Sequence, residues 1–467
     1  MRVRLLGHYV HVSIAAMAAI EALVFLGAML LAYRVRFESW FPIDRLGSKQ
    51  TLWLCSAVFV GANLVSILAF GLYSSRQRAR TSGVFVRLVV AILAAAAGTA
   101  AVVYVLPSLW VGRGVLGLAS LFALIGAGAS RAAFSRMMDE SILKRRVVVY
   151  GVGQRTTAIS GLRRRSDRRG FEIVGYVQPD GESIAVPPER VLDASEGILT
   201  LSTRLDVQEI VVAMEDRRRG FPILGLLECR LAGIEVTELL TFLERETGRV
   251  RIDVLNPSWM IFGEGFRRDP VRLFSSRALD LVASALLLIL SLPFMLITMV
   301  AIKLEDGWRA PVFYGQARVG LAGQPFKVLK FRSMRTDAER EGQAQWAQKS
   351  DPRVTRVGAV IRKLRIDELP QILNVLSGQM SFVGPRPERP QFVAELAQKI
   401  PYYVQRHCVK PGITGWAQLC YPYGSSEEDA LEKLQYDLYY IKNNTLLFDL
   451  AILVQTAEVV FMGKGAR

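Results

Sequence analysis

Asp367 and Glu368 are the residues whose types and setting most clearly suggest chemistry. They follow a basic run that ends at Arg365, and Pro370 interrupts helical hydrogen bonding just after them. Two carboxylates at such a break can point in different directions. One of them can then attack a phosphorus atom while the other holds a cation, provided that nearby guanidinium groups neutralise the phosphate. The spacing alone is equally consistent with a charged helix surface.

The charge of the chain also points toward phosphate. Its 467 residues include 58 Lys and Arg against 42 Asp and Glu, and the net charge is +16. The stretch 327–365 holds eleven basic residues and four acidic ones. A positive excess of this kind attracts phosphate groups of nucleic acid, lipid or nucleotide. The chain has only three histidines, two of them near its N-terminus, which argues strongly against a Ser-His-Asp relay or a site with several His ligands.

Four apolar runs in the first third predict a helical membrane bundle over residues 1–136. Each run has about the twenty residues that a helix needs to cross roughly 30 Å of hydrocarbon. Basic clusters before the first run, in the second loop and after the fourth run predict that both ends of the bundle face the cytoplasm. The runs are 12–33, 52–73, 84–106 and 111–134.

The pattern after the bundle predicts an α/β domain that is Rossmann-like, over residues 144–250. Apolar, β-branched stretches alternate with helix-like segments, which favours a parallel sheet. The first stretch leads into Gly151 and Gly153, but Thr156 stands where a dinucleotide-binding loop has its third glycine. We favour a structural or regulatory domain, with dinucleotide binding as the alternative. The predicted strands are 146–151, 171–177, 207–214 and 233–239.

A fifth apolar segment, 278–302, has basic residues on both flanks. A helix that enters the membrane and returns leaves both flanks at the cytoplasmic surface, whereas a crossing helix does not. Ser291 and Pro293 lie near its middle, where a proline removes a backbone donor and a hydroxyl can satisfy a freed carbonyl. The segment therefore predicts a re-entrant hairpin that turns at these residues. A kinked spanning helix is the alternative.

Four motifs in the C-terminal part resemble those of the bacterial sugar transferases, the monotopic polyprenyl-phosphate hexose-1-phosphate transferases. The likeness begins near Phe274 and extends to the C-terminus. The order of the motifs is specific, and the four-helix and Rossmann-like parts resemble the larger members, with features of the exosortase-associated exopolysaccharide branch. The motifs are K-F-R-S-M at 330–334, D-E-L-P-Q at 367–371, F-V-G-P-R-P at 382–387 and P-G-I-T-G-W at 411–416.

The resemblance implies a mainly α catalytic domain over 267–467 and a role for each carboxylate. Asp367 matches the nucleophile that attacks the β-phosphorus of a UDP-sugar and releases UMP. Glu368 matches the ligand of a Mg²⁺ cofactor. Polyprenyl phosphate then accepts the sugar phosphate, which initiates assembly of an exopolysaccharide or a similar glycan. Lys330, Arg332, Arg365 and Arg386 are the candidates for phosphate contacts, although each could equally be a surface charge.

The resemblance also predicts where the protein works. It implies a multi-pass protein of the bacterial cytoplasmic membrane, with its catalytic domain on the cytoplasmic side and a helix at 446–461 on the membrane surface. The family usually has Ser and Pro adjacent in its hairpin, whereas Leu292 separates them here, so the part played by Ser291 is open. UDP-sugar, polyprenyl phosphate, membrane lipids and a second copy of the chain are the expected partners.

Three other functions compete with the transferase. A nucleotide-sugar dehydratase or epimerase needs an intact dinucleotide loop and usually a Tyr-x-x-x-Lys pair, which the sequence lacks. A nucleic-acid-binding protein is disfavoured because no nucleic-acid module is recognisable. A non-catalytic membrane scaffold or regulator of polysaccharide assembly remains the alternative to the transferase. The sequence does not select the sugar.

Overall fold

The computed structural model divides into two compact units, Met1–Phe242 and Leu243–Arg467. The boundary falls within helix α10 (Leu239–Thr247). The chain is mainly helical, with several long apolar helices and a five-stranded parallel sheet. The structure describes residues 2–5, 8–40, 49–70, 72–73, 81–106, 109, 112–137, 144–162, 170–216, 218, 220–255, 257–262, 270–335, 353–421, 424 and 426–461.

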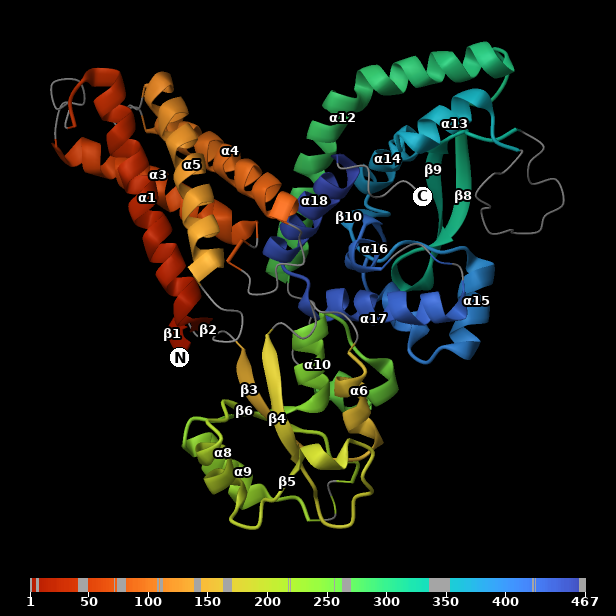
Figure 1. Cartoon of the computed structure of the whole chain (residues 1–467). Helices are drawn as coiled ribbons and strands as arrows, with labels where there is room; N and C mark the ends of the chain where they lie inside the picture. The colour runs from red at the N-terminus through yellow and green to blue at the C-terminus, as the bar shows by residue number, and fades with distance from the viewer. Residues whose placement is uncertain are drawn as a thin grey trace. The chain divides into compact units, whose positions relative to one another are not determined.

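The first unit begins with a hairpin of β1 (Arg2–Leu5) and β2 (His8–His11), followed by four long helices (Figure 1). All four helices are long and apolar enough to cross a membrane, as the sequence predicts. α1 packs against α3 and α5, and α3 packs against α4. The four are α1 (Val12–Phe37), α3 (Lys49–Ala69), α4 (Thr81–Val105) and α5 (Arg113–Met137).

A buried polar cluster joins α1 and α5 to Leu72 and Tyr73, which follow α3 in the chain. Glu21 of α1 is fully buried and accepts hydrogen bonds from Tyr73 (2.6 Å) and from Arg131 of α5 (3.1 Å). Arg131 also donates to the carbonyl of Leu72 (3.1 Å). A buried ionic group in an apolar bundle is costly unless it is paired, so this cluster satisfies Glu21 within the protein.

A five-stranded parallel sheet follows the bundle, in the order β5-β4-β3-β6-β7. The buried strands are continuous β-branched runs, typical of a sheet that is covered on both faces. Four of the five strands match the predicted stretches, and β5 was not predicted. The strands are β3 (Arg145–Tyr150), β4 (Phe171–Val177), β5 (Val191–Leu192), β6 (Glu209–Val212) and β7 (Glu235–Glu238).

Short helices connect these strands and complete the core of the sheet. α8 and α9 lie side by side and bury Leu201, Leu226 and Cys229 against Val148 and Ile210 of the sheet. The helices are α6 (Thr157–Ser160), α8 (Ile198–Arg204) and α9 (Ile223–Leu231).

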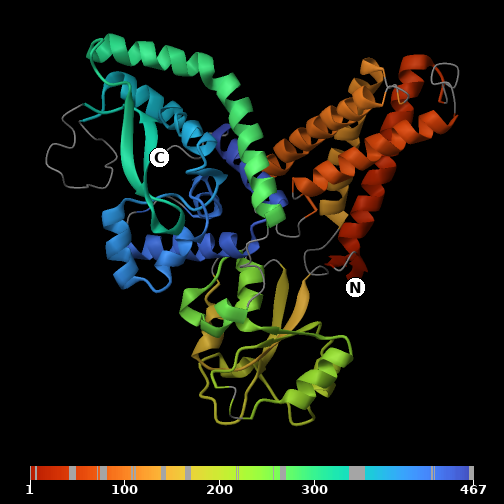
Figure 2. The ribbon, with the colours of Figure 1, turned by 180° about the vertical axis from the view of Figure 1, so that it is seen from behind.

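The second unit contains a long apolar helix, α12 (Pro270–Asp306), that bends along its length (Figures 1 and 2). Pro293 lies inside it and has no N–H to donate to the carbonyl of Ile289, which explains a bend of this kind. Ser291 is buried, and its hydroxyl donates to the carbonyl of Leu288 (3.5 Å). The helix extends beyond the predicted 278–302 at both ends.

The remainder of the second unit surrounds a β-hairpin and a short parallel pair. The hairpin is β8 (Phe313–Val319) with β9 (Pro325–Phe331), and the parallel pair is β10 (Ser381–Val383) with β11 (Gly412–Thr414). Its other helices are α11 (Pro257–Phe262), α13 (Arg356–Lys363), α14 (Gln371–Leu376), α15 (Pro390–Lys399), α16 (Trp416–Cys420), α17 (Glu427–Asn443) and α18 (Leu446–Phe461).

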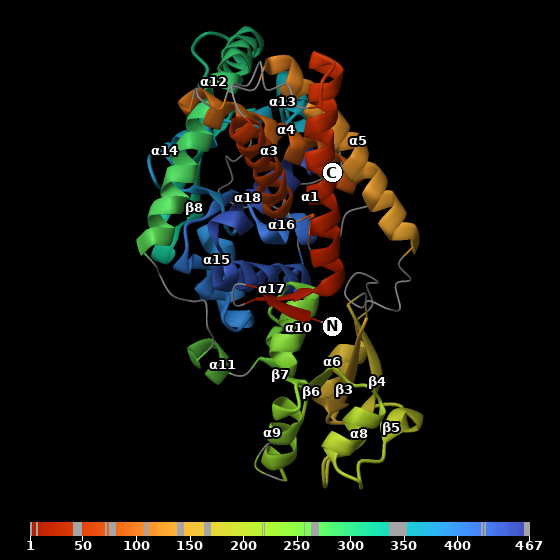
Figure 3. The same cartoon turned by 90° about the vertical axis from the view of Figure 1, so that its left-hand side faces the viewer.

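Helices α15 and α17, both visible in Figures 1 and 3, contribute side chains to one core of this unit. Leu396 of α15 packs with Leu434 and Leu438 of α17, and Val250 joins them from the start of the unit. Helix α17 begins with a capping box, in which the Ser426 hydroxyl accepts a hydrogen bond from the Asp429 amide. The second unit therefore has a packed framework behind the carboxylate pair.

Candidate active site

The carboxylate pair lies on a tight turn between α13 and α14. Arg365 adopts a left-handed conformation with φ of 60°, which ends α13, and Ile366–Glu368 form a single 3-10 turn. Pro370 directly precedes α14, where the missing N–H costs nothing because the first helical amides have no partner within the helix. The predicted break in the helix is confirmed, and it directs the two carboxylates away from a continuous helix face.

Glu368 is held by basic residues from three separate segments. Its Oε1 accepts hydrogen bonds from Lys330 Nζ of β9 (2.9 Å) and from Arg386 Nη2 (3.0 Å). Arg365 Nη1 lies 3.7 Å from Oε2. Burial alone would raise the pKa of Glu368, but Arg386 and Lys330 outweigh it and hold that pKa well below its usual range. Glu368 is therefore ionised at neutral pH.

Asp367 has the opposite environment, although it is the adjacent residue. It is 8% exposed and makes no hydrogen bond or ion pair with any residue in the described part of the chain. Burial raises its pKa, and the charge of Glu368 adds to this effect, while Lys330 and Arg362 oppose it. An unpaired carboxylate beside cationic groups is suited to attack an electrophile that carries negative charge.

Of the four predicted phosphate contacts, the structure brings three together at Glu368: Lys330, Arg365 and Arg386. Arg332 is not among them. It is buried beside β9 and pairs with Asp306 at the end of α12. Phosphate binding by Arg332 therefore stays a prediction that the observed pairing does not favour.

The F-V-G-P-R-P and P-G-I-T-G-W motifs meet backbone to backbone. Gly384 N donates to the Thr414 carbonyl (2.9 Å), and Gly412 N donates to the Pro385 carbonyl (3.0 Å). A Cβ at Gly384 or Gly412 would collide with main-chain atoms of the other segment. The glycines therefore allow the two strands to approach closely, and this contact sets the position of Arg386.

Asn374, which lies outside the four sequence motifs, fixes Lys330 relative to the carboxylates. Its Oδ1 accepts a hydrogen bond from Leu329 N (2.9 Å), and its Nδ2 donates to the Lys327 carbonyl (2.8 Å). The Asn374 side chain on α14 thus makes hydrogen bonds to the main chain of β9, as a neighbouring strand would. The only sequence signal for Asn374 is its position six residues after Glu368 in a short helix. Its hydrogen-bond partners are distant in sequence, so that position does not predict them.

Two polar residues near the start of α12 connect that helix to the same site. Asp280 is buried and accepts hydrogen bonds from the Ser381 hydroxyl (2.8 Å) and the Phe382 amide (2.9 Å). Arg277 donates to the carbonyls of Val375 (2.6 Å) and Leu376 (2.7 Å) at the end of α14. These contacts join the long apolar helix to both β10 and α14.

The tyrosines that precede the last helix lie in the core. Tyr436 and Tyr440 are buried, and the Tyr440 hydroxyl donates to Asp449 Oδ1 (2.8 Å) and lies 3.1 Å from the Val383 carbonyl oxygen. Tyr439 contacts the rings of Trp416 and Phe448. Packing, rather than an open binding surface, explains these aromatic residues.

Comparison with known proteins agrees with this geometry. The family model described as bacterial sugar transferase matches residues 271–463, which include both carboxylates and their basic partners. A relative from Caulobacter vibrioides, named UDP-glucose:undecaprenyl-phosphate glucose-1-phosphate transferase, is 43% identical over 192 residues. That match covers 41% of this chain and 71% of the relative.

Two further relatives extend the likeness. A protein of the same name from Xanthomonas campestris pv. campestris is 29% identical over 497 residues, covering 99% of this chain and 96% of the relative. A UDP-N-acetylgalactosamine-undecaprenyl-phosphate N-acetylgalactosaminephosphotransferase from Aeromonas hydrophila is 45% identical over 242 residues, covering 52% of this chain and 56% of the relative. The chain belongs to the bacterial sugar transferase family.

Proposed function

We propose that this protein is a phosphoglycosyl transferase that moves a sugar 1-phosphate from a UDP-sugar to undecaprenyl phosphate. The observation that carries the proposal is a contrast: Asp367 has no ion-pair partner among the residues that the structure describes, whereas Glu368 is ion-paired to Lys330 and Arg386. The substrates in the names of the relatives support the same reaction. Initiation of exopolysaccharide or similar glycan assembly is the pathway role that fits it.

The reaction proceeds in two displacements. An Asp367 carboxylate oxygen attacks the β-phosphorus of the UDP-sugar, and the bond from that phosphorus to the bridging oxygen breaks as UMP leaves with the electron pair. The product is an acyl phosphate that joins Asp367 to the sugar phosphate. A phosphate oxygen of undecaprenyl phosphate then attacks the same phosphorus and releases the Asp367 carboxylate. Lys330, Arg365 and Arg386 offset the negative charge in both displacements.

The residues present fit a Mg²⁺ ion at Glu368. Magnesium sites often use one or two carboxylates and complete the coordination shell with substrate phosphates and water. Oε1 of Glu368 is taken by Lys330 and Arg386, while Oε2 has only Arg365, at 3.7 Å, within the described residues. Mg²⁺ bound there would neutralise charge on the diphosphate. Among the residues that the structure describes, no group of three metal-type ligands exists, so substrate oxygens would complete the site.

We further propose that α12 is re-entrant and that the catalytic domain lies on the cytoplasmic side of the inner membrane. The bend in α12, its internal Pro293 and the basic residues on both flanks support this arrangement. Undecaprenyl phosphate is a membrane lipid and a UDP-sugar is soluble, so the carboxylates belong at the interface. A reporter fused after residue 305 is expected to remain cytoplasmic, and a periplasmic reporter would instead establish a spanning helix.

The parallel-sheet domain is Rossmann-like in strand order, and we propose a structural or regulatory role for it. Two carboxylates occupy the amides of its glycine-rich turn: Glu182 accepts from Val152 N (2.9 Å), and Glu215 accepts from Gln154 N. A dinucleotide pyrophosphate would use such amides. Because carboxylates of the protein itself occupy these amides, the pairing supports a structural or regulatory role rather than dinucleotide binding.

The purified protein with undecaprenyl phosphate and a panel of UDP-sugars tests the proposed reaction. We expect UMP release that depends on one or a few of the sugars, with glucose and N-acetylgalactosamine as the first candidates from the relatives described above. Light scattering of the same sample tests the expected homodimer. Binding of undecaprenyl phosphate without UMP release from any UDP-sugar would favour the scaffold instead.

A further inference from the structure

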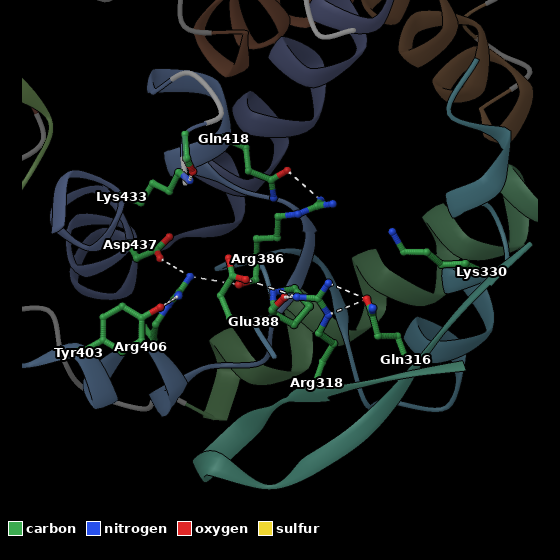
Figure 4. A network of polar contacts seen from close by, with 12 residues as sticks. Gln316, Arg318, Lys330, Arg386, Glu388, Tyr403, Arg406, Gln418, Lys433 and Asp437 are labelled. Carbon is green, nitrogen blue, oxygen red and sulfur yellow. Dashed lines mark hydrogen bonds and ion pairs between the residues drawn. The ribbon is translucent and has the colours of Figure 1, made fainter. Parts of the chain in front are cut away.

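A buried ion pair lies behind the carboxylates and takes no part in the reaction proposed above. Arg406, on the turn Tyr403–Cys408, is 6% exposed, and Asp437 of α17 is 2% exposed. Arg406 Nη2 lies 2.8 Å from Asp437 Oδ2 (Figure 4). A buried ion pair is seldom more stabilising than packed apolar residues of the same volume. Its other contacts therefore indicate what it does.

Arg406 bridges α17 and the turn that carries Arg386. Its Nη1 donates to the Tyr403 hydroxyl (2.6 Å), and its Nη2 donates both to Asp437 and to the main-chain carbonyl of Arg386 (3.1 Å). Burial would lower the pKa of Arg406, but Tyr403 and Asp437 outweigh it and hold that pKa above its usual value. The guanidinium is therefore charged and keeps its donors aimed at fixed acceptors.

Three consecutive carbonyls of the G-P-R-P turn are each held by a different segment. The Pro385 carbonyl accepts from Gly412 N (3.0 Å), the Arg386 carbonyl accepts from Arg406, and the Pro387 carbonyl accepts from Arg318 Nη1 (3.1 Å). Proline has no N–H, so Pro385 and Pro387 cannot be fixed through an amide. After the Gly384 amide, which donates to the Thr414 carbonyl, these three carbonyls are the main-chain groups of the described residues that hold the turn.

The conformation of that turn determines the orientation of the Arg386 side chain. Its side chain is 30% exposed, and its guanidinium donates to Glu368 Oε1 (3.0 Å) and, at 3.5 Å, to Gln418 Oε1. Packing alone does not lock a side chain that is this exposed. The flanking prolines fix φ on both sides, so a rotation of the Arg386 carbonyl would move its Cα and its guanidinium together.

We propose that Arg406 and Asp437 are positioning residues for phosphate binding, acting through the carbonyl of Arg386. The inference rests on the proposed function, because Arg386 is there the phosphate contact. Loss of the Arg406 contact would move the Arg386 guanidinium away from Glu368 and the diphosphate. Misplacement by about 1 Å can lower catalytic efficiency about 100-fold.

A double-mutant cycle tests this role in the full-length protein. Arg406→Lys keeps a positive charge opposite Asp437 but lacks the planar fork that reaches three acceptors. It is combined with Arg386→Gln, and kcat/KM for UMP release and the Kd for UDP are measured for all four proteins. Arg318→Gln, at the next carbonyl, is a second variant on a partly exposed side chain. Lys442→Met is the matched control, because Lys442 pairs with Glu244 in the same unit and neither residue contacts the turn.

We expect Arg406→Lys to lower kcat/KM and UDP affinity about 10- to 100-fold in the wild-type background, and less than about 3-fold when Arg386 is already Gln. Lys442→Met should lower Tm while leaving both quantities unchanged. Equal losses in both backgrounds would show that Arg406 is only structural. UMP release by the wild-type protein tests the proposed reaction separately. If Arg406 and Arg386 are coupled in UDP affinity but the wild-type protein releases no UMP, the positioning role is supported and the proposed reaction is overturned.

Discussion

Asp367 and Glu368 are neighbours in the chain, yet the cations of the site contact only one of them. Lys330 and Arg386 both lie within 3.0 Å of Glu368 Oε1, whereas Asp367 has no hydrogen-bond or ion-pair partner among the residues that the structure describes. Glu368 collects the positive charge, and Asp367 stays available beside it. A carboxylate nucleophile needs a free oxygen beside the cations that bind the phosphate, and this arrangement leaves the Asp367 carboxylate in that position.

Asn374→Ala should separate β9 from α14. The substitution removes the partners of Leu329 N and the Lys327 carbonyl, so we expect the free energy of unfolding to fall by about 1–3 kcal/mol. UDP affinity should also fall, because Lys330, a proposed phosphate contact, lies on β9, which the substitution no longer holds against α14. Chemical unfolding and UDP titration measure the two effects, and unchanged UDP affinity in a folded variant would show that the clamp does not position Lys330.

Gly412→Ala should disrupt the parallel pair β10–β11. A Cβ there would collide with main-chain atoms of Gly384 and Thr414, so neither strand can accommodate it by rotating a side chain. We expect a loss of about 1–3 kcal/mol or more in stability, together with loss of activity. Gly225→Ala in α9 is the control, since a Cβ there would be in ordinary contact with Ile198, and it should be neutral or stabilising. A stable, active Gly412→Ala protein would contradict the close approach.

The fold is predictable from sequence where local hydrophobic patterns determine it. Strands β3 and β4 match the predicted stretches 146–151 and 171–177 to within one residue, because each is a buried apolar run. The predicted 278–302 segment marks only the most apolar part of α12. The helix also includes the more polar residues on both sides of this part, and Arg277, just before it, donates to main-chain carbonyls at the end of α14.

The candidate site was predictable only in part, for a related reason. The motifs identify both carboxylates and three of the basic residues that surround Glu368. They do not reveal that Arg332 pairs with Asp306, or that Asn374 holds β9. The Asn374 contacts join residues 45 and 47 positions apart, so no local pattern encodes them.

The pH dependence of catalysis should report on Asp437. Burial raises its pKa to about 6, with Glu388 adding to the rise and Arg406 and Lys433 opposing it. As pH falls through about 6, Asp437 is protonated and its ion pair with Arg406 is lost, so kcat/KM should decline. The folded-state pKa lies above the unfolded value, so this titration favours the folded protein as pH falls, and the decline is not unfolding.

The measurement is a kcat/KM profile between about pH 5 and 8, with Tm recorded at each pH. Asp437→Asn should have lower activity and no acid-side decline near pH 6. If Asp437→Asn shows the same decline in kcat/KM at acid pH as the wild type, protonation of a group other than Asp437 causes that decline.

Removal of the metal should stop the wild-type reaction, and Glu368→Gln should weaken the response to added Mg²⁺. EDTA should abolish UMP release, and excess MgCl₂ should restore it. In Glu368→Gln we expect a loss of about 100- to 1,000-fold in kcat and weaker Mg²⁺ binding in calorimetry with UDP present. Glu395→Gln, an exposed carboxylate that pairs with Lys399, is the control. Wild-type Mg²⁺ affinity in Glu368→Gln would remove Glu368 from the metal site.

Covalent labelling of Asp367 tests the central claim most directly. The wild-type protein, incubated with a UDP-sugar that carries a radiolabel in the sugar but without undecaprenyl phosphate, should retain label and release one UMP per active site. Asp367→Asn should do neither, whereas Asp253→Asn, the same change at an exposed carboxylate, should behave as the wild type. Retained labelling and UMP release in Asp367→Asn would contradict the assignment of Asp367 as the nucleophile.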